Sequence, residues 1–328
     1  MKDEFSLIQK IAPKKTYQSS LIQGIGDDAA LFRAAAGYDE IVCTDTLVEG
    51  VHFLQSTMRP FHIGYKALAA NLSDIAAMGG IPLFYLVSIA VPPAWAEEDV
   101  LEIYEGMRSL AERYQIDLIG GDTCAAPNEL VVTVTVIGRV EKGRHLLRSQ
   151  ARPGDVVFIT NTVGNAAAGL ELLLKKNGNE PYSEEEAFFV SCHQTPAPQV
   201  EFGRFFAESG VRIALNDISD GVASEAHEIA ENSEVSLILY PDSLPFHPYM
   251  KRFSGEKQLD FALYGGEDFQ LIGTAAKSDW EKIKKECAQK GWRITEVGTV
   301  MEGKGVYLEV DDRLMELEKR GYNHFRKR

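Results

Sequence analysis

Six short motifs in this chain place acidic residues among glycine, serine or threonine. Carboxylates in such settings are good oxygen ligands for a hard cation, and Mg²⁺ is usually held by a few carboxylates together with substrate phosphates. One such motif is also what an ordinary polar turn looks like. Six motifs across the chain predict a site that gathers metal and polyphosphate from distant segments. They occupy residues 24–28, 44–46, 71–74, 120–123, 216–221 and 265–268.

The first two motifs each allow a second interpretation. The adjacent carboxylates of Asp27 and Asp28 repel each other unless a cation or separate partners relieve them, but a polar turn explains them equally well. Asp45 stands near the end of a predicted apolar strand, a common place for ligand contacts in α/β folds, although aspartate also caps helices. His52 is either a contact for a substrate phosphate or a structural histidine.

Asp74 has the clearest functional interpretation from the residues alone. It lies on a predicted helix that is otherwise rich in alanine, leucine, isoleucine and methionine. Asn71, three residues earlier, shares its helical face. A carboxylate on a largely apolar helix is costly to bury without a partner. A role in ligand binding is therefore favoured over a structural one.

The later motifs leave the choice open. Gly121 and Asp122 follow an apolar stretch, so the motif is either a close backbone approach with a metal-binding carboxylate or a tight turn. Asp217, Ser219 and Asp220 precede a predicted helix, whose N-terminus favours either a side-chain cap or a phosphate.

Two further residues are candidates for substrate or phosphate binding. Glu267 follows two glycines and precedes a predicted strand, where it either contacts substrate or forms a turn. Arg148 is a candidate phosphate contact or an ordinary surface arginine.

Hydrophobic periodicity predicts the elements that must position these residues. Strands and helices are mixed throughout, so the fold class is α/β or α+β. The Arg152-Pro153-Gly154-Asp155 turn marks a boundary, which divides the chain into predicted domains at 1–148 and 149–328. The predicted strands cover 39–47, 130–140, 156–159, 211–217, 235–240 and 268–274. The predicted helices cover 62–79, 98–114, 165–176, 221–232 and 278–290, with two more flanking Pro196 and Pro198.

Bulk composition excludes several classes of partner. The 328 residues carry a formal net charge of -14, which disfavours binding of nucleic acid or an anionic membrane but not of metal-bound ATP. The four cysteines are far apart and lack CxxC spacing, so neither a zinc site nor a disulfide framework is expected. The sequence shows neither a signal-peptide pattern nor an apolar run of transmembrane length. We therefore expect a cytoplasmic protein.

Three familiar catalytic patterns are missing from the sequence. It contains no G-x-x-x-x-G-K-[ST] phosphate-binding loop. It also lacks the protein-kinase motif set and the G-x-S-x-G nucleophile elbow. Any nucleotide must therefore be bound by another route.

The motifs in order resemble the thiamine-monophosphate kinase family, within the superfamily of aminoimidazole ribonucleotide synthetase, selenophosphate synthetase and the hydrogenase-maturation dehydratase. The resemblance covers about residues 5–325. The T-D-T-L-V-x-G-x-H-F string at 44–53 and the terminal G-Y-x-H-F at 321–325 point to this family within the superfamily. The other matching segments are 24–31, 66–79, 120–123, 218–221 and 265–268.

The resemblance implies ATP-dependent, direct in-line phosphorylation of thiamine monophosphate to thiamine diphosphate with several Mg²⁺ ions. It implies catalytic roles for Asp45, Asp122 and Asp217. The implied metal ligands are Asp28, Asp45, Asp74, Asp122 and Asp217, with Thr44 and the Cys43 backbone assisting and Asp220 holding a further ion. The implied ATP contacts are Tyr104, Gly121, Asp122, Arg148 and Ser219, and the implied substrate contacts are His52, Glu267 and Tyr322. Position 43 is often serine in the family, a change that a backbone ligand tolerates.

The resemblance also implies a two-domain synthetase-like fold. The N-terminal sheets of a homodimer would form a shared barrel, and the C-terminal domain would be α/β. Two alternatives remain open at this point. One is another ATP-dependent enzyme of the superfamily, and the other is a non-catalytic thiamine-phosphate or nucleotide sensor.

Overall fold

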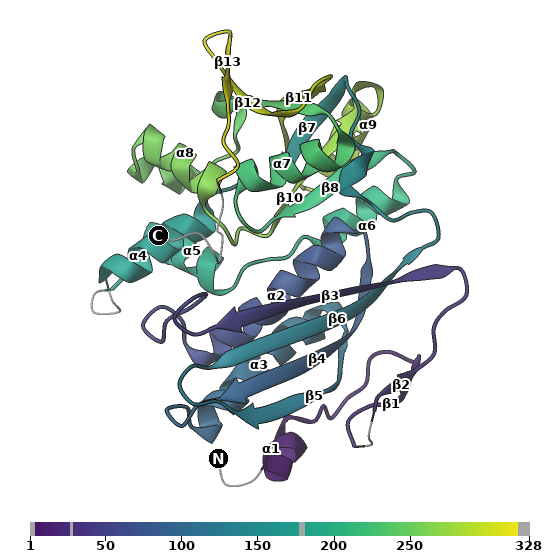
Figure 1. The fold of residues 1–328 in the computed structure, drawn as a ribbon, viewed down its shortest axis with the longest axis vertical. Coiled ribbons are helices and arrows are strands. Elements are labelled where there is room, and N and C mark those ends of the chain that lie inside the picture. The colour runs from purple at the N-terminus through teal and green to yellow at the C-terminus, as the bar shows by residue number, and fades with distance from the viewer. Residues whose placement is uncertain (1–3, 27–28, 177–180, 321–328) are drawn as a thin grey trace.

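The computed structural model describes residues 4–26, 29–176 and 181–320. Two β-sheets form the body of the molecule, one in each half of the chain, and most helices pack beside them (Figure 1). This mixed α/β architecture confirms the predicted fold class. In the described part of the chain, no helix is both long and apolar enough to cross a membrane.

The N-terminal half is built on a four-stranded sheet in the order β3-β6-β4-β5, where only the β4-β5 pair is parallel. A short β1-β2 hairpin packs on one face of this sheet, and α2 and α3 cover the other (Figure 1). The strands are β1 Leu21–Gln23, β2 Leu31–Phe32, β3 Tyr38–Val48, β4 Ile81–Val91, β5 Asp117–Ala125 and β6 Val131–Glu141, and the helices are α1 Glu4–Ile11, α2 Pro60–Ala77 and α3 Glu97–Tyr114.

Strand β6 confirms the alternation read from the sequence. Its Val132, Val134 and Val136 are fully buried beneath α2 and α3. Thr133 and Thr135 point to the opposite face, where their hydroxyls hydrogen-bond across to the threonines of β3. The sheet therefore has one face covered by helices, the closed face, and one face that is lined by hydroxyls here and covered in part by the β1-β2 hairpin, the open face. This distinction decides which site residues can meet.

Glycines let α2 and α3 pack backbone to backbone. A Cβ on Gly64 would lie 1.8 Å from the Ile103 carbonyl oxygen, and one on Gly106 would lie 1.9 Å from the Phe61 carbonyl oxygen. Neither site has room for a side chain. The close approach fixes α2, which carries Asp74, relative to the rest of the N-terminal half.

The C-terminal half is built on a seven-stranded sheet in the order β13-β12-β9-β11-β7-β10-β8, antiparallel except for β12-β9. The strands are β7 Asp155–Thr160, β8 Ile213–Ile218, β9 Ser236–Leu239, β10 Gln270–Ala276, β11 Ile294–Met301, β12 Gly305–Val310 and β13 Arg313–Glu316. The helices are α4 Asn165–Lys176, α5 Glu184–Gln194, α6 Val200–Glu208, α7 Val222–Ser233, α8 Gly255–Tyr264 and α9 Lys277–Gln289, with 3-10 turns at Arg148–Gln150, Pro241–Ser243 and Pro248–Arg252.

The two halves share a core where α2 meets α6 and β8. Ala76, Phe206 and Leu215 belong to one buried apolar cluster. A Cβ on Gly203 of α6 would lie 2.0 Å from the carbonyl oxygen of Ala76 on α2. Because this contact is tight, the C-terminal part of α2 is held directly against the second half of the chain. The two halves thus share part of their core, and the domain boundary at residue 148 stays a prediction.

Candidate active site at the junction of the two sheets

Three carboxylates from distant segments come together where the two sheets meet. Asp45 comes from β3, Asp74 from the last turn of α2 and Asp217 from β8. Asp45 lies opposite the buried Val134, so it points to the closed face toward α2, and its carboxyl hydrogen-bonds that of Asp74. The prediction that these residues share one site agrees with this arrangement.

The carboxylates disfavour one another's charge. Burial, followed by the charges of Asp217 and Asp45, raises the pKa of Asp74 to about 8. Burial raises the pKa of Asp217 to about 6, although a hydrogen bond from Ser73 and the charge of Arg148 oppose this. Burial also raises the pKa of Asp45, and the hydrogen bond with Asp74 opposes it. Without a cation, Asp74 therefore stays protonated near neutral pH.

The donor set fits divalent cations that also bind phosphate. Asp45, Asp74 and Asp217 offer oxygen donors whose mutual repulsion a cation would relieve. Within residues 4–26, 29–176 and 181–320, no group of three or more His, Cys, Asp or Glu side chains is placed to hold a metal ion by itself. Mg²⁺ commonly needs only one or two carboxylates when phosphate oxygens and water supply the rest. These residues therefore suit ions that arrive with a polyphosphate.

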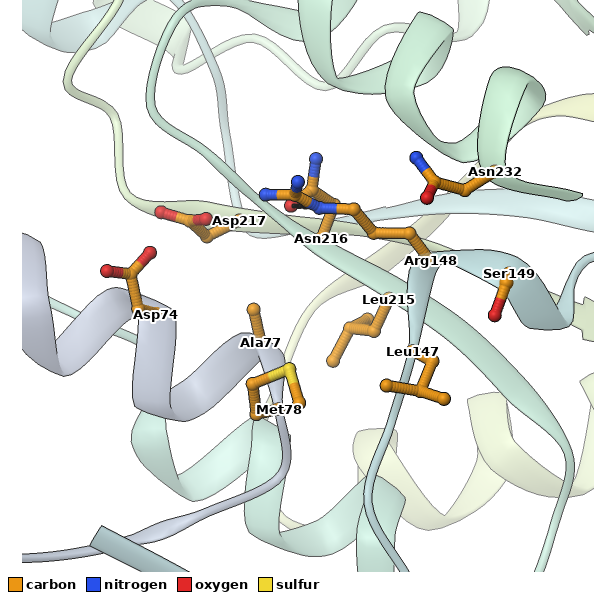
Figure 2. Close-up of a pocket in the computed structure, with 10 residues that line it drawn as sticks. All are labelled: Asp74, Ala77, Met78, Leu147, Arg148, Ser149, Leu215, Asn216, Asp217 and Asn232. Carbon is orange, nitrogen blue, oxygen red and sulfur yellow. Dashed lines mark hydrogen bonds between the residues drawn. The ribbon is translucent and has the colours of Figure 1, made fainter. Parts of the chain in front are cut away.

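A cavity of about 380 Å³ adjoins the carboxylates (Figure 2). Asp74 and Asp217 lie at one end, and the Arg148 side chain extends along the cavity toward them (Figure 2). Arg148 Nε donates to Asn216 Oδ1 at 2.8 Å, and its NH1 lies 2.6 Å from Glu228 Oε2. The cavity thus places a fixed guanidinium beside the acidic cluster, as an anionic ligand with bound cations would need. Its lining residues are Asp74, Ala77, Met78, Leu147, Arg148, Ser149, Leu215, Asn216, Asp217 and Asn232.

Glu225 of α7, which sequence analysis did not identify, organises the loop after β8. Its carboxylate accepts hydrogen bonds from the Asp220 backbone N–H at 3.1 Å, from Ser219 Oγ at 3.4 Å and from Asn216 Nδ2. Burial, followed by the charge of Asp217, raises its pKa to about 8. The available signal was an acidic residue on the apolar face of a predicted helix, the same signal that identified Asp74.

The cap suggested for α7 is not formed by the predicted residues. Gly221 occupies the N-cap position with φ of 100°, and no side-chain cap bond is present. Ser219 and Asp220 instead lie in the preceding loop, which Glu225 holds. This arrangement leaves the two residues as candidates for ligand contact.

His52 and Glu267, the predicted substrate contacts, lie near the carboxylate cluster. His52 Nδ1 accepts the Val48 N–H at 3.0 Å. Its charge favours the ionised forms of both Asp45 and Glu267, opposing the burial that raises the pKa of Asp45 and contributing to the lowered pKa of Glu267. One histidine therefore connects the predicted metal ligands to the predicted substrate subsite.

Asp122 does not meet the cluster in this single chain. It lies opposite Ser88, which in turn lies opposite Thr133 on the open face. Residues directly opposite across a sheet share a face, whereas Asp45 is on the closed face. Strands β3 and β5 also form opposite edges of the four-stranded sheet. The role predicted for Asp122 stays a prediction that this geometry does not explain.

The other predicted residues of the N-terminal sheet have mixed environments. Gly121 permits a close strand contact, because a Cβ there would lie 1.9 Å from the Val87 carbonyl oxygen. Thr44 points to the open face and donates to the Val134 carbonyl at 3.1 Å. Cys43 Sγ instead lies 3.4 Å from the Asn71 carbonyl oxygen, and burial strongly raises the pKa of its thiol.

For three predicted residues, the structure gives no position that supports the predicted ligand contact. Tyr104 is buried at 8% exposure in the core of the N-terminal half and does not line the cavity. Burial there opposes direct contact with a nucleotide at this cavity. Asp28 and Tyr322 lie outside the described residues.

Known proteins resemble the chain over nearly its full length. Family models described as AIR synthase related protein match with their N-terminal domain at residues 26–140 and their C-terminal domain at 152–311. A thiamine-monophosphate kinase of Bacillus subtilis (strain 168) is 51% identical over 326 residues, covering 99% of this chain and 100% of the relative.

Solved structures agree with this similarity. The crystal structure of thiamine-monophosphate kinase from Stenotrophomonas maltophilia K279a superposes with a TM-score of 0.85 at 32% identity, covering 93% of this chain and 96% of the other. AaThiL complexed with AMPPCP and TMP superposes with a TM-score of 0.79 at 32% identity, covering 92% of each chain.

Proposed function

The chain belongs to the AIR synthase related family, in its thiamine-monophosphate kinase branch, and from this premise we propose how it performs its reaction. It is a phosphotransferase that uses ATP to convert thiamine monophosphate to thiamine diphosphate. The convergence of Asp45, Asp74 and Asp217 beside a cavity spanned by Arg148 is the observation that carries the proposal. The bound pair of ligands in AaThiL, an ATP analogue and TMP, supports it.

The chemistry asks mainly for positioning and charge compensation. The acceptor is a phosphate whose oxygen is already a nucleophile at neutral pH, so no strong general base is needed, and in-line transfer depends on alignment. Mg²⁺ ions, when bound, would reduce the repulsion between the two negatively charged substrates. Arg148, fixed by Asn216 and Glu228, orients phosphate oxygens.

The proposed ligand assignments follow the positions of the side chains. Asp45, Asp74 and Asp217 hold the ions at the junction, and Asp220 holds a further ion from the loop that Glu225 positions. Ser219 and Arg148 bind ATP, while His52 and Glu267 bind thiamine monophosphate. The roles of Asp28, Cys43, Thr44, Tyr104, Gly121, Asp122 and Tyr322 rest on the resemblance alone.

We expect phosphate to pass directly between the substrates without a phosphoenzyme, because no described residue needs to act as a covalent carrier. Incubation with γ-labelled ATP should leave the protein unlabelled after denaturation. A stable labelled protein would contradict direct transfer.

We also propose a homodimer joined through the N-terminal sheets. Strand β3 is an eleven-residue edge strand, and its Val42 is 70% exposed. Such an edge invites pairing with another strand, and Ile22 and Leu31 of the hairpin on the open face of the same sheet are each 55% exposed. Light scattering should give the mass of two chains at micromolar concentration; a monomer there would refute this proposal. A cytoplasmic location, with no nucleic-acid or membrane partner, agrees with the acidic composition.

The test is a thiochrome fluorescence assay for thiamine diphosphate with MgATP and thiamine monophosphate. Wild type should form product, and Asp45→Asn should lose nearly all activity because a carboxylate of the cluster is removed. Asp39→Asn, an exposed position on the same strand, should retain activity. Activity only with formylglycinamidine ribonucleotide would instead support another reaction of the superfamily, and tight calorimetric binding without product would support a sensor.

A further inference from the structure

A fully buried lysine lies behind the predicted substrate contact. Lys66 of α2 is 1% exposed, and its Nζ lies 2.8 Å from Glu267 Oε2. Glu267 belongs to the segment between α8 and β10, so the ion pair joins the two halves of the chain. Burying an ammonium group is expensive unless it is closely paired. The buried ammonium group of Lys66 therefore depends on the few polar groups that contact it.

His193 of α5 completes the surroundings of this pair. Its Nε2 and Nδ1 lie 3.2 Å and 3.4 Å from Lys66 Nζ, and its Nδ1 lies 3.3 Å from Glu267 Oε2. Burial and the Lys66 charge lower the pKa of His193 to about 3, so the ring is neutral and can accept from the ammonium. Burial raises the pKa of Glu267, but the charge and hydrogen bond of Lys66, together with neighbouring charges, outweigh it and hold the pKa below the usual range. Glu267 is therefore an ionised acceptor.

The contacts of Glu267 are asymmetric. Both Lys66 and His193 approach Oε2, while Oε1 has no hydrogen-bond or ion-pair partner among the residues that the structure describes. The Glu267 side chain as a whole is 26% exposed, so it is not closed off from a ligand. The charge of His52, beside the carboxylate cluster, acts on the same group. Oε2 is therefore held by two neighbours, whereas Oε1 makes no such contact within the described residues.

The backbone around Glu267 is also constrained. Glu267 has a φ of 69°, a left-handed conformation that is uncommon for a residue with a side chain. Its N–H donates to the Ser219 carbonyl at 2.7 Å, and the next residue, Asp268, accepts N–H bonds at the start of α4. Such conformations persist where surrounding contacts over-determine them, often at ligand sites.

We propose that Lys66, supported by His193, is a positioning residue for the acceptor substrate. It fixes Glu267 Oε2 so that Oε1 faces thiamine monophosphate. That substrate carries a permanently cationic thiazolium ring and an amino group, both of which favour contact with a carboxylate oxygen. Lys66 itself is too deeply buried to touch the substrate. This inference rests on the proposed function, because it assigns a role in binding one of the two substrates.

The test separates substrate positioning from general support of the fold. Lys66→Met removes the charge at similar length. Arg204→Met is the matched control, because it breaks another ion pair between the halves, 2.9 Å from Glu141, away from the cavity. We expect both variants to lower the melting temperature. Only Lys66→Met should raise the KM for thiamine monophosphate, by about ten-fold or more, with the KM for MgATP changed less than about two-fold.

A mutant cycle tests whether Lys66 acts through Glu267. Adding Lys66→Met to Glu267→Gln should leave the KM for thiamine monophosphate within about two-fold of that of Glu267→Gln alone. If the single variant Lys66→Met does not fold, the comparison of the double variant with Glu267→Gln alone is the test of whether Lys66 acts through Glu267. A further KM increase in the double variant, or equal KM values in Lys66→Met and Arg204→Met, would overturn the inference while leaving the proposed function intact. An inactive wild type would instead overturn the proposed function and this inference with it.

Discussion

The raised pKa of Asp74 predicts that removing this carboxylate stabilises the ligand-free protein while abolishing its activity. The native carboxyl keeps its proton up to a pH of about 8, whereas an unfolded aspartate releases it near pH ~3.9. Between these values the native state binds more protons than the unfolded state. The free energy of unfolding therefore falls as the pH rises through this window. Asparagine at position 74 removes that loss.

The size of the effect follows from the width of the window. From about pH 4 to pH 7 it spans about three pKa units, an upper bound of ~4 kcal/mol. Asp74 is partly accessible and shares its proton with Asp45, so we expect roughly 1–2 kcal/mol at pH 7. With an unfolding entropy of about 2.1 cal/mol/K per residue, this corresponds to a melting-temperature increase of about 2–3 °C.

The assay is differential scanning calorimetry of wild type and Asp74→Asn without ligands, from pH 4 to pH 8. The difference in melting temperature should be near zero at pH 4 and grow as the pH rises. Added MgATP should stabilise wild type more than the variant. Asp39→Asn, exposed on β3, should show no such trend. The reasoning would be refuted if the melting temperature of Asp74→Asn relative to wild type were lower at pH 8 than at pH 4.

Three further predictions follow from neighbouring contacts. Ser73→Ala removes the 2.8 Å hydrogen bond to Asp217, so the pKa of the Asp217 carboxyl should rise from about 6. The acidic limb of the pH–rate profile should then move to higher pH by about one unit. An acidic limb at the wild-type pH would contradict this. Gly64→Ala should cost about 2 kcal/mol or more in chemical denaturation, whereas Gly255→Ala, with open space around its Cβ, should cost nothing. Arg148→Met should raise the KM for ATP by about ten-fold or more in steady-state assays, and an unchanged KM would remove this residue from the ATP site.

Hydrophobic periodicity located most helices and strands such as β3, β6 and β8, but it missed the inner strand β4 and the edge strand β5 of the N-terminal sheet and β11 of the C-terminal sheet. The predicted helix 165–176 coincides with α4, and the strand 130–140 with β6. Strand β4 was missed because it is nearly continuously apolar and begins beside Pro82, which also marks the end of the preceding helix. Helix α8 was missed as well. A short apolar run cannot be assigned by periodicity when it has no polar alternation.

The candidate site was predictable where an acidic residue stood on an apolar element, and less so elsewhere. Asp74 gave that signal and indeed lies beside Asp45 and Asp217. Glu225 gave the same signal and was overlooked. The faces of the N-terminal sheet were not predictable, because a one-residue change of register exchanges them. The separation of Asp122 from Asp45 therefore emerged only from strand pairing.

Two groups of charged residues at the junction differ in how their carboxylates are balanced, and this difference explains the site's division of labour.

 Among the residues that the structure describes, no lysine pairs with Asp45, Asp74 or Asp217, and the charge of Arg148 only partly offsets the burial of Asp74 and Asp217, so Asp74 keeps a proton near neutral pH until cations replace it. Glu267 is instead an ionised carboxylate paired with Lys66. Metal-bound phosphate is thereby attracted to the first cluster, while Glu267 keeps a fixed charge and competes less for the same ions. An acidic protein can in this way hold two anionic substrates and still bind the organic part of one of them separately.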